Sequence, residues 1–207
     1  MRWDESMMGD QSGKVAVVTG SNTGIGYYMA RALASKGASV IMACRDPSKG
    51  EGARDRILEE FPGSEVSVSV LDLADLSSIE EFADGFPSEG GLDILINNAG
   101  VMIPPKSRTK DGFELQFGTN HLGHFALTGR LLPMLEKTEG SRVVTVSSIA
   151  HNPGFIDFED LHGDSKRYNK WGFYSQSKIA NLTFSLELGR RLERAGSGVS
   201  AIASHPG

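Results

Sequence analysis

The stretch Lys14-Val-Ala-Val-Val-Thr-Gly-Ser-Asn-Thr-Gly-Ile-Gly26 places a glycine-rich turn between a β-branched run and a helical pattern. The run at 14–20 is short, rich in valine and ends on glycine, which is typical of a buried parallel strand. The helical pattern begins at Ile25 and is stopped by Gly37. This order of strand, turn and helix predicts an α/β fold.

The turn itself suits a phosphate group. Glycines let the backbone approach a pyrophosphate, and the amides and dipole of a helix N-terminus then hold its charge. The spacing differs from the G-x-G-x-x-G fingerprint, because three residues separate the first two glycines. A plain tight turn is the alternative interpretation. The residues expected to contact a dinucleotide are Gly20, Ser21, Asn22, Thr23, Gly24, Ile25 and Gly26.

Strands and helices continue to alternate along the whole sequence. The expected strands are residues 14–20, 39–44, 66–73, 92–96, 141–146 and 199–204. The expected helices are residues 25–36, 50–61, a segment from 76, 113–136 and 174–196. Six strands that alternate with helices predict a Rossmann-type, doubly wound parallel sheet in a single domain.

Composition excludes several classes of function. The chain of 207 residues is long enough for one large domain, here 13–207, and its net charge of −5 argues against nucleic-acid binding. The single cysteine, Cys44, excludes an internal disulfide, argues against a thiolate metal cluster and fits a cytoplasmic location. No apolar run reaches the roughly 18–20 residues that span a bilayer. Residues 1–12 lack the apolar core of a signal peptide and are expected to be a disordered lead-in.

The residues after the second and third strands bear on the choice of dinucleotide. Folds selective for NAD usually place an acidic residue after the second strand, whereas a guanidinium suits a 2′-phosphate. Arg45 occupies this position, so we expect NADP(H) to be favoured over NAD(H), although Asp46 follows directly. Asp72 and Leu73 follow the third strand and are expected at the adenine. Asp72 is equally well placed to cap the helix from residue 76.

The segment Asn97-Asn98-Ala99-Gly100 follows the fourth strand. Its small residues allow a ligand to approach the backbone, while the amide side chains can brace neighbouring strands. A simple polar turn is the alternative. We count Asn98, Ala99 and Gly100 among the expected cofactor-binding residues.

Polar residues interrupt the otherwise apolar helix expected at 113–136. A buried asparagine must be hydrogen-bonded, so Asn120 either braces a bulge in the helix or belongs to a chain of water molecules. His121 and His124 lie three residues apart, but no third ligand is near them in the sequence. We therefore predict no metal site.

Two further candidates lie late in the chain. Tyr174 and Lys178 are four residues apart and share one face if the segment is helical. A phenol can act as an acid/base near neutral pH only if something stabilises its phenolate, and an ammonium one turn away can do so. A solvated surface pair is the alternative. The fifth strand delivers Ser147-Ser148 to its carboxyl end, where a serine either caps a turn or donates to a substrate oxygen. No nucleophile elbow supports a serine hydrolase.

Four motifs in sequence order are similar to those of the short-chain dehydrogenase/reductase family. They are T-G-x-x-x-G-I-G at 19–26, N-N-A-G at 97–100, a serine after the fifth strand and Y-x-x-x-K at 174–178. The resemblance runs from about 14 to 207. Within the family the chain resembles the retinol dehydrogenase-like branch, through the segments at 23–26, 43–46, 97–102, 120–125 and 147–151 and the long spacer before Tyr174.

The resemblance implies an NADP-dependent oxidoreductase that acts on a small-molecule carbonyl or alcohol. By position, Tyr174 is the general acid/base, and Lys178 favours its phenolate and holds the nicotinamide ribose. Ser148 polarises the substrate oxygen, while Asn120 fixes a water that relays protons to Lys178. Pro206-Gly207 resembles the family's turn beside the nicotinamide amide. The hydride chemistry belongs to the cofactor.

Two other functions fit parts of this pattern. A light-dependent reductase of a pigment precursor belongs to the same superfamily and shares the tyrosine–lysine pair. A dinucleotide-sensing protein would bind the cofactor without turnover. All four expected catalytic positions carry chemically competent side chains, which favours the enzyme.

The chain departs from the family pattern in two ways. It stops where the family continues through a substrate-binding loop, a helix and a seventh strand, so we expect a domain truncated before its last strand. It also lacks an N-terminal apolar anchor, so we expect a soluble protein. Family members often pair through the helices expected around 113–136 and 174–195, which predicts a homodimer or homotetramer, but the long spacer before Tyr174 could obstruct this pairing.

Overall fold

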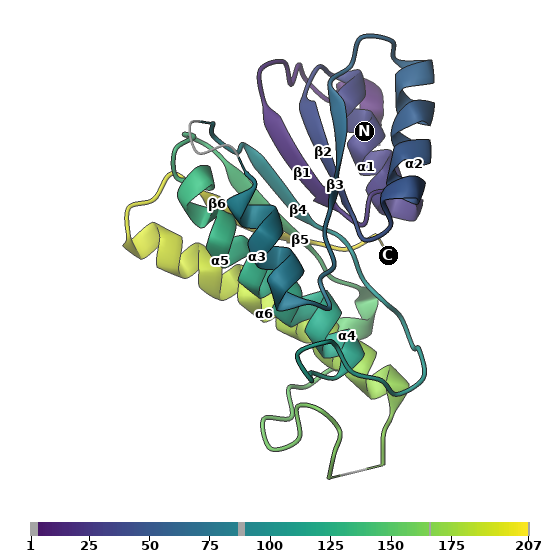
Figure 1. The fold of residues 1–207 in the computed structure, drawn as a ribbon. Coiled ribbons are helices and arrows are strands. Elements are labelled where there is room, and N and C mark those ends of the chain that lie inside the picture. The colour runs from purple at the N-terminus through teal and green to yellow at the C-terminus, as the bar shows by residue number, and fades with distance from the viewer. Residues whose placement is uncertain (1–3, 87–89, 166, 207) are drawn as a thin grey trace.

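The computed structural model describes residues 4–86, 90–165 and 167–206. In this part of the chain, six parallel strands form one sheet in the order β3-β2-β1-β4-β5-β6 (Figure 1). The strands are β1 Val15–Thr19, β2 Ser39–Cys44, β3 Val66–Val70, β4 Ile94–Asn97, β5 Arg142–Val146 and β6 Ser200–Ser204. The helices are α1 Gly24–Ser35, α2 Pro47–Glu60, α3 Leu76–Asp84, α4 Leu115–Phe117, α5 Gly123–Leu135 and α6 Lys170–Arg194.

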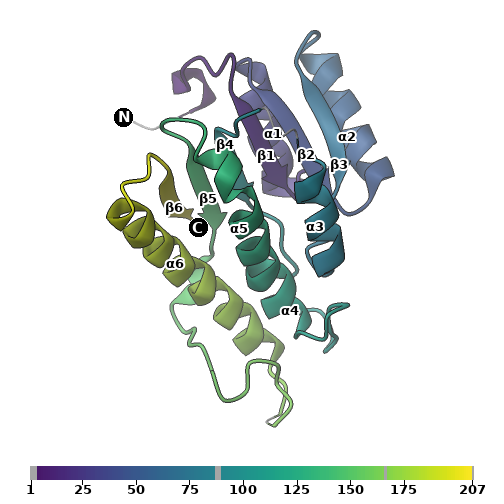
Figure 2. The ribbon, with the colours of Figure 1, turned by 60° about the vertical axis from the view of Figure 1, so that its left-hand side comes forward.

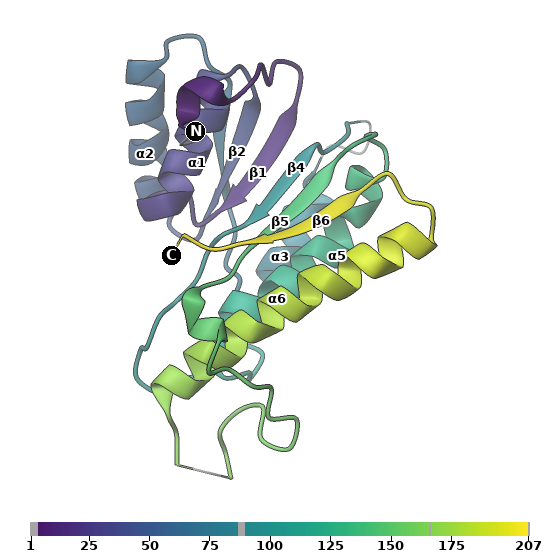
Figure 3. The same cartoon turned by 180° about the vertical axis from the view of Figure 1, so that it is seen from behind.

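Helices cover both faces of the sheet. Figures 2 and 3 show α1 and α2 on one face and α3, α5 and α6 on the other. Side chains of a strand alternate between the faces, so Ala16 and Val18 pack with α1 and α2 whereas Val17 packs with the opposite layer. All three are fully buried, which explains the continuous apolar run of β1. The doubly wound parallel sheet predicted from the sequence is confirmed.

Local capping decides where two helices begin, and one of them begins earlier than expected. Helix α2 begins at Pro47 rather than residue 50, because Asp46 accepts a hydrogen bond from the Lys49 amide and proline suits the first helical turn. Asp75, not Asp72, caps α3 by accepting from the Ser77 amide at 3.0 Å. The capping alternative for Asp72 was therefore wrong, and β3 ends at Val70, before Asp72.

The helix expected over 113–136 is interrupted. A short α4 leads into a π-helical turn, Gly118–Leu122, and only then does α5 begin. The Gly123 amide donates to the Gly118 carbonyl, an i to i+5 bond that defines the wider turn. Asn120 lies at the centre of the turn, so the structure has the helix bulge of the first alternative. Phe125 of α5 is 56% exposed.

The strand order reverses beside β1. The chain moves from β1 outward through β2 to β3, and then returns to place β4 on the other side of β1. In open α/β sheets, ligands bind at the carboxyl ends of the strands at this kind of switch point. The residues that follow β1 and β4 are the glycine-rich turn and the N-N-A-G segment.

The residues described before β1 contact the first helix. Glu5–Met7 form one 3-10 turn, and the Glu5 carboxylate pairs with Arg31 of α1 at 2.9 Å. A separate disordered lead-in stays a prediction. Within the described ranges, none of the helices combines the length and the apolar character that a membrane crossing requires.

Candidate functional site

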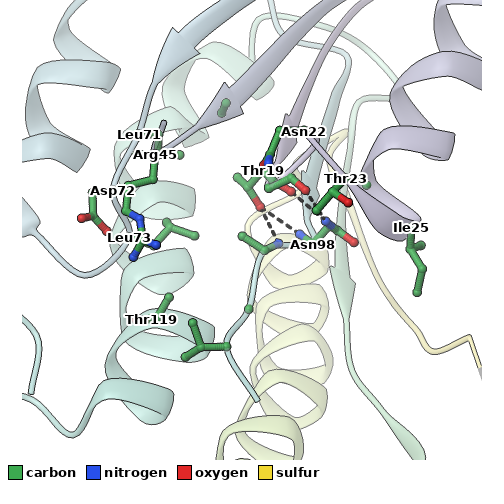
Figure 4. A pocket seen from close by; sticks show the side chains of 16 residues that line it. Thr19, Asn22, Thr23, Ile25, Arg45, Leu71, Asp72, Leu73, Asn98 and Thr119 are labelled. Atoms are coloured by element: carbon green, nitrogen blue, oxygen red, sulfur yellow. Dashed lines mark hydrogen bonds between the residues drawn. The ribbon is translucent and has the colours of Figure 1, made fainter. Parts of the chain in front are cut away.

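A cavity of about 340 Å³ lies at the switch point. Figure 4 shows Thr23 and Ile25 on one side of it and Arg45, Asp72 and Leu73 on the other. Eleven of the residues expected to bind a cofactor line it: Gly20, Asn22, Thr23, Ile25, Gly26, Arg45, Asp72, Leu73, Asn98, Ala99 and Gly100. Five further residues, which were not among those expected to bind a cofactor, also line it: Thr19, Ala43, Leu71, Val101 and Thr119.

Close backbone packing shapes the glycine-rich turn. Gly20 has φ +64°, and a Cβ there would lie 2.8 Å from Ala99. A Cβ on Gly26 would lie 2.4 Å from Nδ2 of Asn98 and 2.6 Å from the Gly20 carbonyl oxygen. The turn therefore packs directly on the N-N-A-G segment, and only glycine fits at these two positions.

Ser21 and Gly24 belong to the turn but are not among the residues that line the cavity. The Ser21 side chain is fully buried, and its hydroxyl donates to the Val18 carbonyl at 2.9 Å. Gly24 has φ +58° and begins α1. These two residues shape the turn, and their contact with a cofactor stays a prediction.

Asparagines 97 and 98 have different tasks. The Asn97 amide is buried and donates to the Thr128 hydroxyl at 2.9 Å, so it braces β4 against α5. The Asn98 side chain points the other way and donates to the Thr19 carbonyl at 2.8 Å. The backbone amides of Asn98 and Ala99 both donate to the Thr19 hydroxyl, at 2.9 and 3.0 Å. Thr19 thus joins the ends of β1 and β4, as the dashed lines in Figure 4 show.

The end of the cavity near β2 and β3 carries charged side chains and one buried hydroxyl. Arg45 is exposed and Asp72 is half-buried, with Oδ1 of Asp72 accepting from the Ala74 amide at 2.9 Å. Thr119, on the π-helical turn, is 9% exposed, and its hydroxyl has no hydrogen-bond partner among the described residues. A buried hydroxyl beside a cavity is available to a ligand, because burial without a partner is costly.

A second, smaller cavity of about 170 Å³ is lined by three of the four expected catalytic residues. Ser148, Tyr174, Lys178 and Pro206 line it together with Met102, Val146 and Ser147. Gly207 lies outside the described residues, so its contact stays a prediction. Ile25, Asn98, Gly100 and Val101 line both cavities, so the two form one continuous cleft from Arg45 to Tyr174.

Lys178 is held in an apolar environment. Its side chain is 5% exposed, and Nζ donates to the Val146 carbonyl at 3.2 Å. Nζ lies 5.6 Å from the centre of the Tyr174 ring, as their four-residue spacing on α6 predicts. Burial lowers the pKa of Lys178 from 10.5 to about 8. The solvated surface pair considered above is therefore wrong.

The two serines after β5 are not equivalent. Ser147 is buried, and its hydroxyl donates to the Lys178 carbonyl at 2.8 Å, which ties β5 to α6. The Ser148 hydroxyl accepts from the Ala150 amide at 3.2 Å, at the start of the 3-10 turn Ile149–His151. Its hydrogen remains available to a group in the cavity, which favours Ser148 over Ser147 as a donor to substrate.

Asn120 is fully buried beneath the cleft. Its side chain accepts from the Val101 amide at 2.8 Å and donates to the Val101 carbonyl at 2.9 Å and to the Ser177 hydroxyl at 3.0 Å. It therefore joins the N-N-A-G segment to α6. A water chain through Asn120 stays a prediction.

Metal ligands do not cluster in the described ranges. Among residues 4–86, 90–165 and 167–206, no three His, Cys, Asp or Glu side chains lie where they could hold one metal ion. His121 instead bonds to the Asn181 amide oxygen at 3.2 Å, and His124 bonds to Thr19 and Asn120.

Comparison with known proteins agrees with this arrangement. Residues 14–207 match the model of the short chain dehydrogenase family. The chain belongs to the short-chain dehydrogenase/reductase family. It is 53% identical to human retinol dehydrogenase 12 over 196 residues, which cover 94% of this chain and 61% of that protein. It therefore lies in the retinol dehydrogenase-like branch, but spans less than two thirds of this relative's length.

Solved structures of similar proteins have the same fold. A crystal structure of an uncharacterized Mycobacterium paratuberculosis protein is 53% identical, with a TM-score of 0.90, and the match covers 99% of this chain and 72% of that one. A metagenomic short-chain oxidoreductase in complex with NADP is 26% identical, with a TM-score of 0.75, covering 95% of this chain and 83% of that one.

Proposed function

We propose that the protein is an NADP(H)-dependent oxidoreductase that interconverts a small-molecule carbonyl and its alcohol. The observation that carries this proposal is the continuous cleft, which has the glycine-rich turn and Arg45 at one end and Tyr174, Lys178 and Ser148 at the other. A bound nicotinamide dinucleotide would supply or accept the hydride. The similarity to retinol dehydrogenases supports a carbonyl or alcohol substrate.

The residues at the cleft fit such a dinucleotide. The Gly20 and Gly26 positions allow a pyrophosphate to approach the backbone at the start of α1. At the other end, the unsatisfied Thr119 hydroxyl and the Asp72 carboxylate offer polar contacts to an adenosine group. Lys178 lies beside Gly100, where a Cβ would be 3.8 Å from Nζ, so its ammonium is in reach of a ribose hydroxyl held in the cleft.

The catalytic end can move a proton at the substrate oxygen. Ser148 donates a hydrogen bond to this oxygen, and the Tyr174 hydroxyl gives it a proton in reduction or removes one in oxidation. The Lys178 ammonium favours the phenolate that remains, because a nearby positive charge stabilises a negative one. Asn120 fixes the segment around Val101, which lines both cavities.

Turnover of a carbonyl panel tests the proposed function. The purified protein should oxidise NADPH in the presence of at least one aldehyde or ketone, with rates that rise and saturate with substrate. Binding of NADPH without turnover of any aldehyde, ketone or alcohol would instead favour a dinucleotide-sensing protein. Absence of NADPH binding would contradict the proposal altogether.

Gly26→Ala should weaken dinucleotide binding. The new Cβ would displace the Asn98 amide, which lies 2.4 Å away, and so disturb its bond to the Thr19 carbonyl. We expect the Kd for NADPH to rise by about tenfold, equivalent to roughly 1.4 kcal/mol. Fluorescence titration with NADPH measures this change. Gly52→Ala is the matched control, since its Cβ would meet nothing within 4 Å in α2, and an unchanged Kd for Gly26→Ala would contradict the packing described here.

Arg45→Asp should change the preference between cofactors. A guanidinium bond to a charged phosphate contributes about 1.5–3 kcal/mol, so its loss should weaken NADPH binding by roughly 10- to 100-fold while NADH binding improves. The ratio of the two Kd values measures the effect. Arg54→Asp makes the same charge change on α2, outside the cavity, and should leave the ratio unchanged. An unchanged ratio for Arg45→Asp would remove Arg45 from this role.

The helices α5 and α6 are the proposed surface for a homodimer or homotetramer. Phe125 of α5 and Leu186 of α6 are 56% and 58% exposed, and the Phe125 ring lies 5.5 Å from that of Phe184. Apolar side chains exposed on neighbouring helices are typical of an association surface. Sedimentation analysis of the oligomeric state tests this proposal. The cytoplasmic location expected from the sequence also stays a prediction.

A further inference from the structure

His124 links two segments beneath the cleft. It lies on α5 and is 1% exposed. Its Nδ1 is 2.9 Å from the Asn120 carbonyl oxygen, and its Nε2 is 2.9 Å from the Thr19 hydroxyl oxygen. One imidazole therefore bridges the π-helical turn and the end of β1, which are about a hundred residues apart in the sequence.

The two partners decide which ring nitrogen carries the proton. A carbonyl oxygen can only accept, so Nδ1 must donate to Asn120. In a neutral imidazole the other nitrogen is then an acceptor, and Nε2 must receive the hydrogen of the Thr19 hydroxyl. The Ile96 carbonyl oxygen is the other acceptor available to that hydrogen, but it lies farther from the Thr19 hydroxyl oxygen, at 3.3 Å. His124 is thereby held in its Nδ1–H form.

The same arrangement satisfies the Thr19 hydroxyl completely. This oxygen has one hydrogen and two lone pairs. The hydrogen goes to Nε2 of His124, and the lone pairs accept from the amides of Asn98 and Ala99 at 2.9 and 3.0 Å. If the hydroxyl turned away, a lone pair of Nε2 would face a lone pair of Thr19. His124 therefore fixes the orientation in which Thr19 holds both amides.

We propose that His124 is a positioning residue for the dinucleotide. As the Nδ1–H tautomer it holds Thr19, the Asn98–Ala99 amides and the Asn120 turn together as one unit. This unit sets the position of the bound dinucleotide. The proposal rests on the proposed function, because the unit it fixes forms the floor of the proposed cofactor cleft. His124 lines neither cavity and touches neither cofactor nor substrate in this role. Its effect passes through Thr19 and Asn120.

The surroundings of His124 keep it neutral. Burial chiefly, together with the charges of Lys178 on α6 and of His121 one turn earlier, lowers the pKa of His124 to about 4. The Asn120 carbonyl acts in the opposite direction. A proton added to Nε2 would present a third donor to the Thr19 oxygen, which already accepts two amides. The bridge thus depends on the neutral ring.

Nitrogen NMR of the histidine-labelled protein tests the tautomer directly. We expect the His124 resonances near neutral pH to show a protonated Nδ1 and an unprotonated Nε2, the reverse of the form that free histidine prefers. The assignment can be made by comparison with His124→Phe or, if this variant does not fold, by coupling to the α5 backbone. A protonated Nε2 would overturn the proposal.

Dinucleotide affinity tests the positioning role. His124→Phe keeps an aromatic ring at this position but removes both nitrogens, so we expect the Kd for NADPH to rise about tenfold, as expected for the loss of a buried hydrogen-bond partner. His121→Phe is the matched control, because His121 bonds to Asn181 and not to the cleft floor, and its Kd should equal that of the wild type. A lower melting temperature with an unchanged Kd for His124→Phe would show a purely structural role and overturn the proposal.

A double variant tests the route through Thr19. If His124 acts by orienting the Thr19 hydroxyl, Thr19→Val combined with His124→Phe should raise the Kd no further than the stronger single variant. If the Kd of the double variant rose by the product of the two single fold-changes, the proposal would be overturned. Thr19→Ser keeps the hydroxyl, so it should raise the Kd less than Thr19→Val does, and this comparison serves if His124→Phe does not fold. Failure of the wild type to bind NADPH would instead refute the proposed function.

Discussion

Tyr174→Phe should lower kcat for carbonyl reduction by about 10³-fold while leaving the Kd for NADPH unchanged. General acid catalysis by a positioned side chain contributes roughly 10²–10⁴-fold, and this substitution removes the only proton the tyrosine side chain can give. The ring itself stays, so the walls of the smaller cavity keep their shape. Steady-state rates and an NADPH titration on the same preparations separate the two quantities.

Tyr168→Phe is the control for this prediction. Tyr168 lies six residues earlier, and its hydroxyl donates to the buried Glu114 carboxylate at 2.7 Å, outside the catalytic cavity. We expect this variant to lose some stability and to retain its kcat. If Tyr174→Phe retained wild-type turnover, the tyrosine would not be the acid/base and the proposed mechanism would be wrong.

Elements set by local sequence could be predicted well. The glycine-rich turn, its flanking strand and helix, and the helix that carries Tyr174 and Lys178 all follow from spacing within a few residues. The β-branched runs gave the strands, and the order of strands and helices gave the doubly wound sheet. Eleven residues expected at the dinucleotide lie along one cavity because parallel strands bring their carboxyl ends to one edge.

Contacts between distant segments could not be predicted. The bond of His124 to Thr19 joins residues 105 positions apart, and it exists because α5 packs under β1. In the sequence, His124 was considered only as a metal ligand beside His121. The π-helical turn was likewise one of two alternatives, since the bonds of Asn120 to Val101 and Ser177 depend on tertiary packing.

The roles of Thr119 and Asp75 could not be predicted from the sequence either. The role of Asp75 as a helix cap was hidden by the nearby Asp72, because both precede the same helix and only backbone geometry decides between them. Thr119 looks like an ordinary helix residue until its hydroxyl is found buried and unsatisfied among the described residues beside the cavity. Burial of a polar group is visible only in the folded chain.

Lys178→Met should abolish most turnover and yet stabilise the protein without cofactor. Burial lowers the pKa of Lys178 from 10.5 to about 8. At pH 7 the lysine is charged, so folding must bury this charge. The cost is about 3 kcal/mol, at roughly 1.36 kcal/mol per pKa unit. Methionine removes this cost but also the bond to the Val146 carbonyl, which contributes about 1 kcal/mol. We expect a net gain of roughly 1–3 kcal/mol in the free energy of unfolding at pH 7. The kcat should fall by about 10²-fold or more, because no ammonium favours the Tyr174 phenolate.

The pH dependence of stability distinguishes this cause from better packing. The unfolded chain has the higher Lys178 pKa, so between pH 8 and 10.5 it binds more protons than the folded chain, and wild-type stability should rise with pH across this window. Lys178→Met should lose that rise, whereas Lys170→Met, which replaces an exposed lysine of the same helix, should keep it. Urea unfolding at pH 7, 8, 9 and 10 measures all three proteins. If the curves for the wild type and Lys178→Met ran parallel, burial of the ammonium would not destabilise the folded chain. The predicted gain in stability from Lys178→Met would then be wrong.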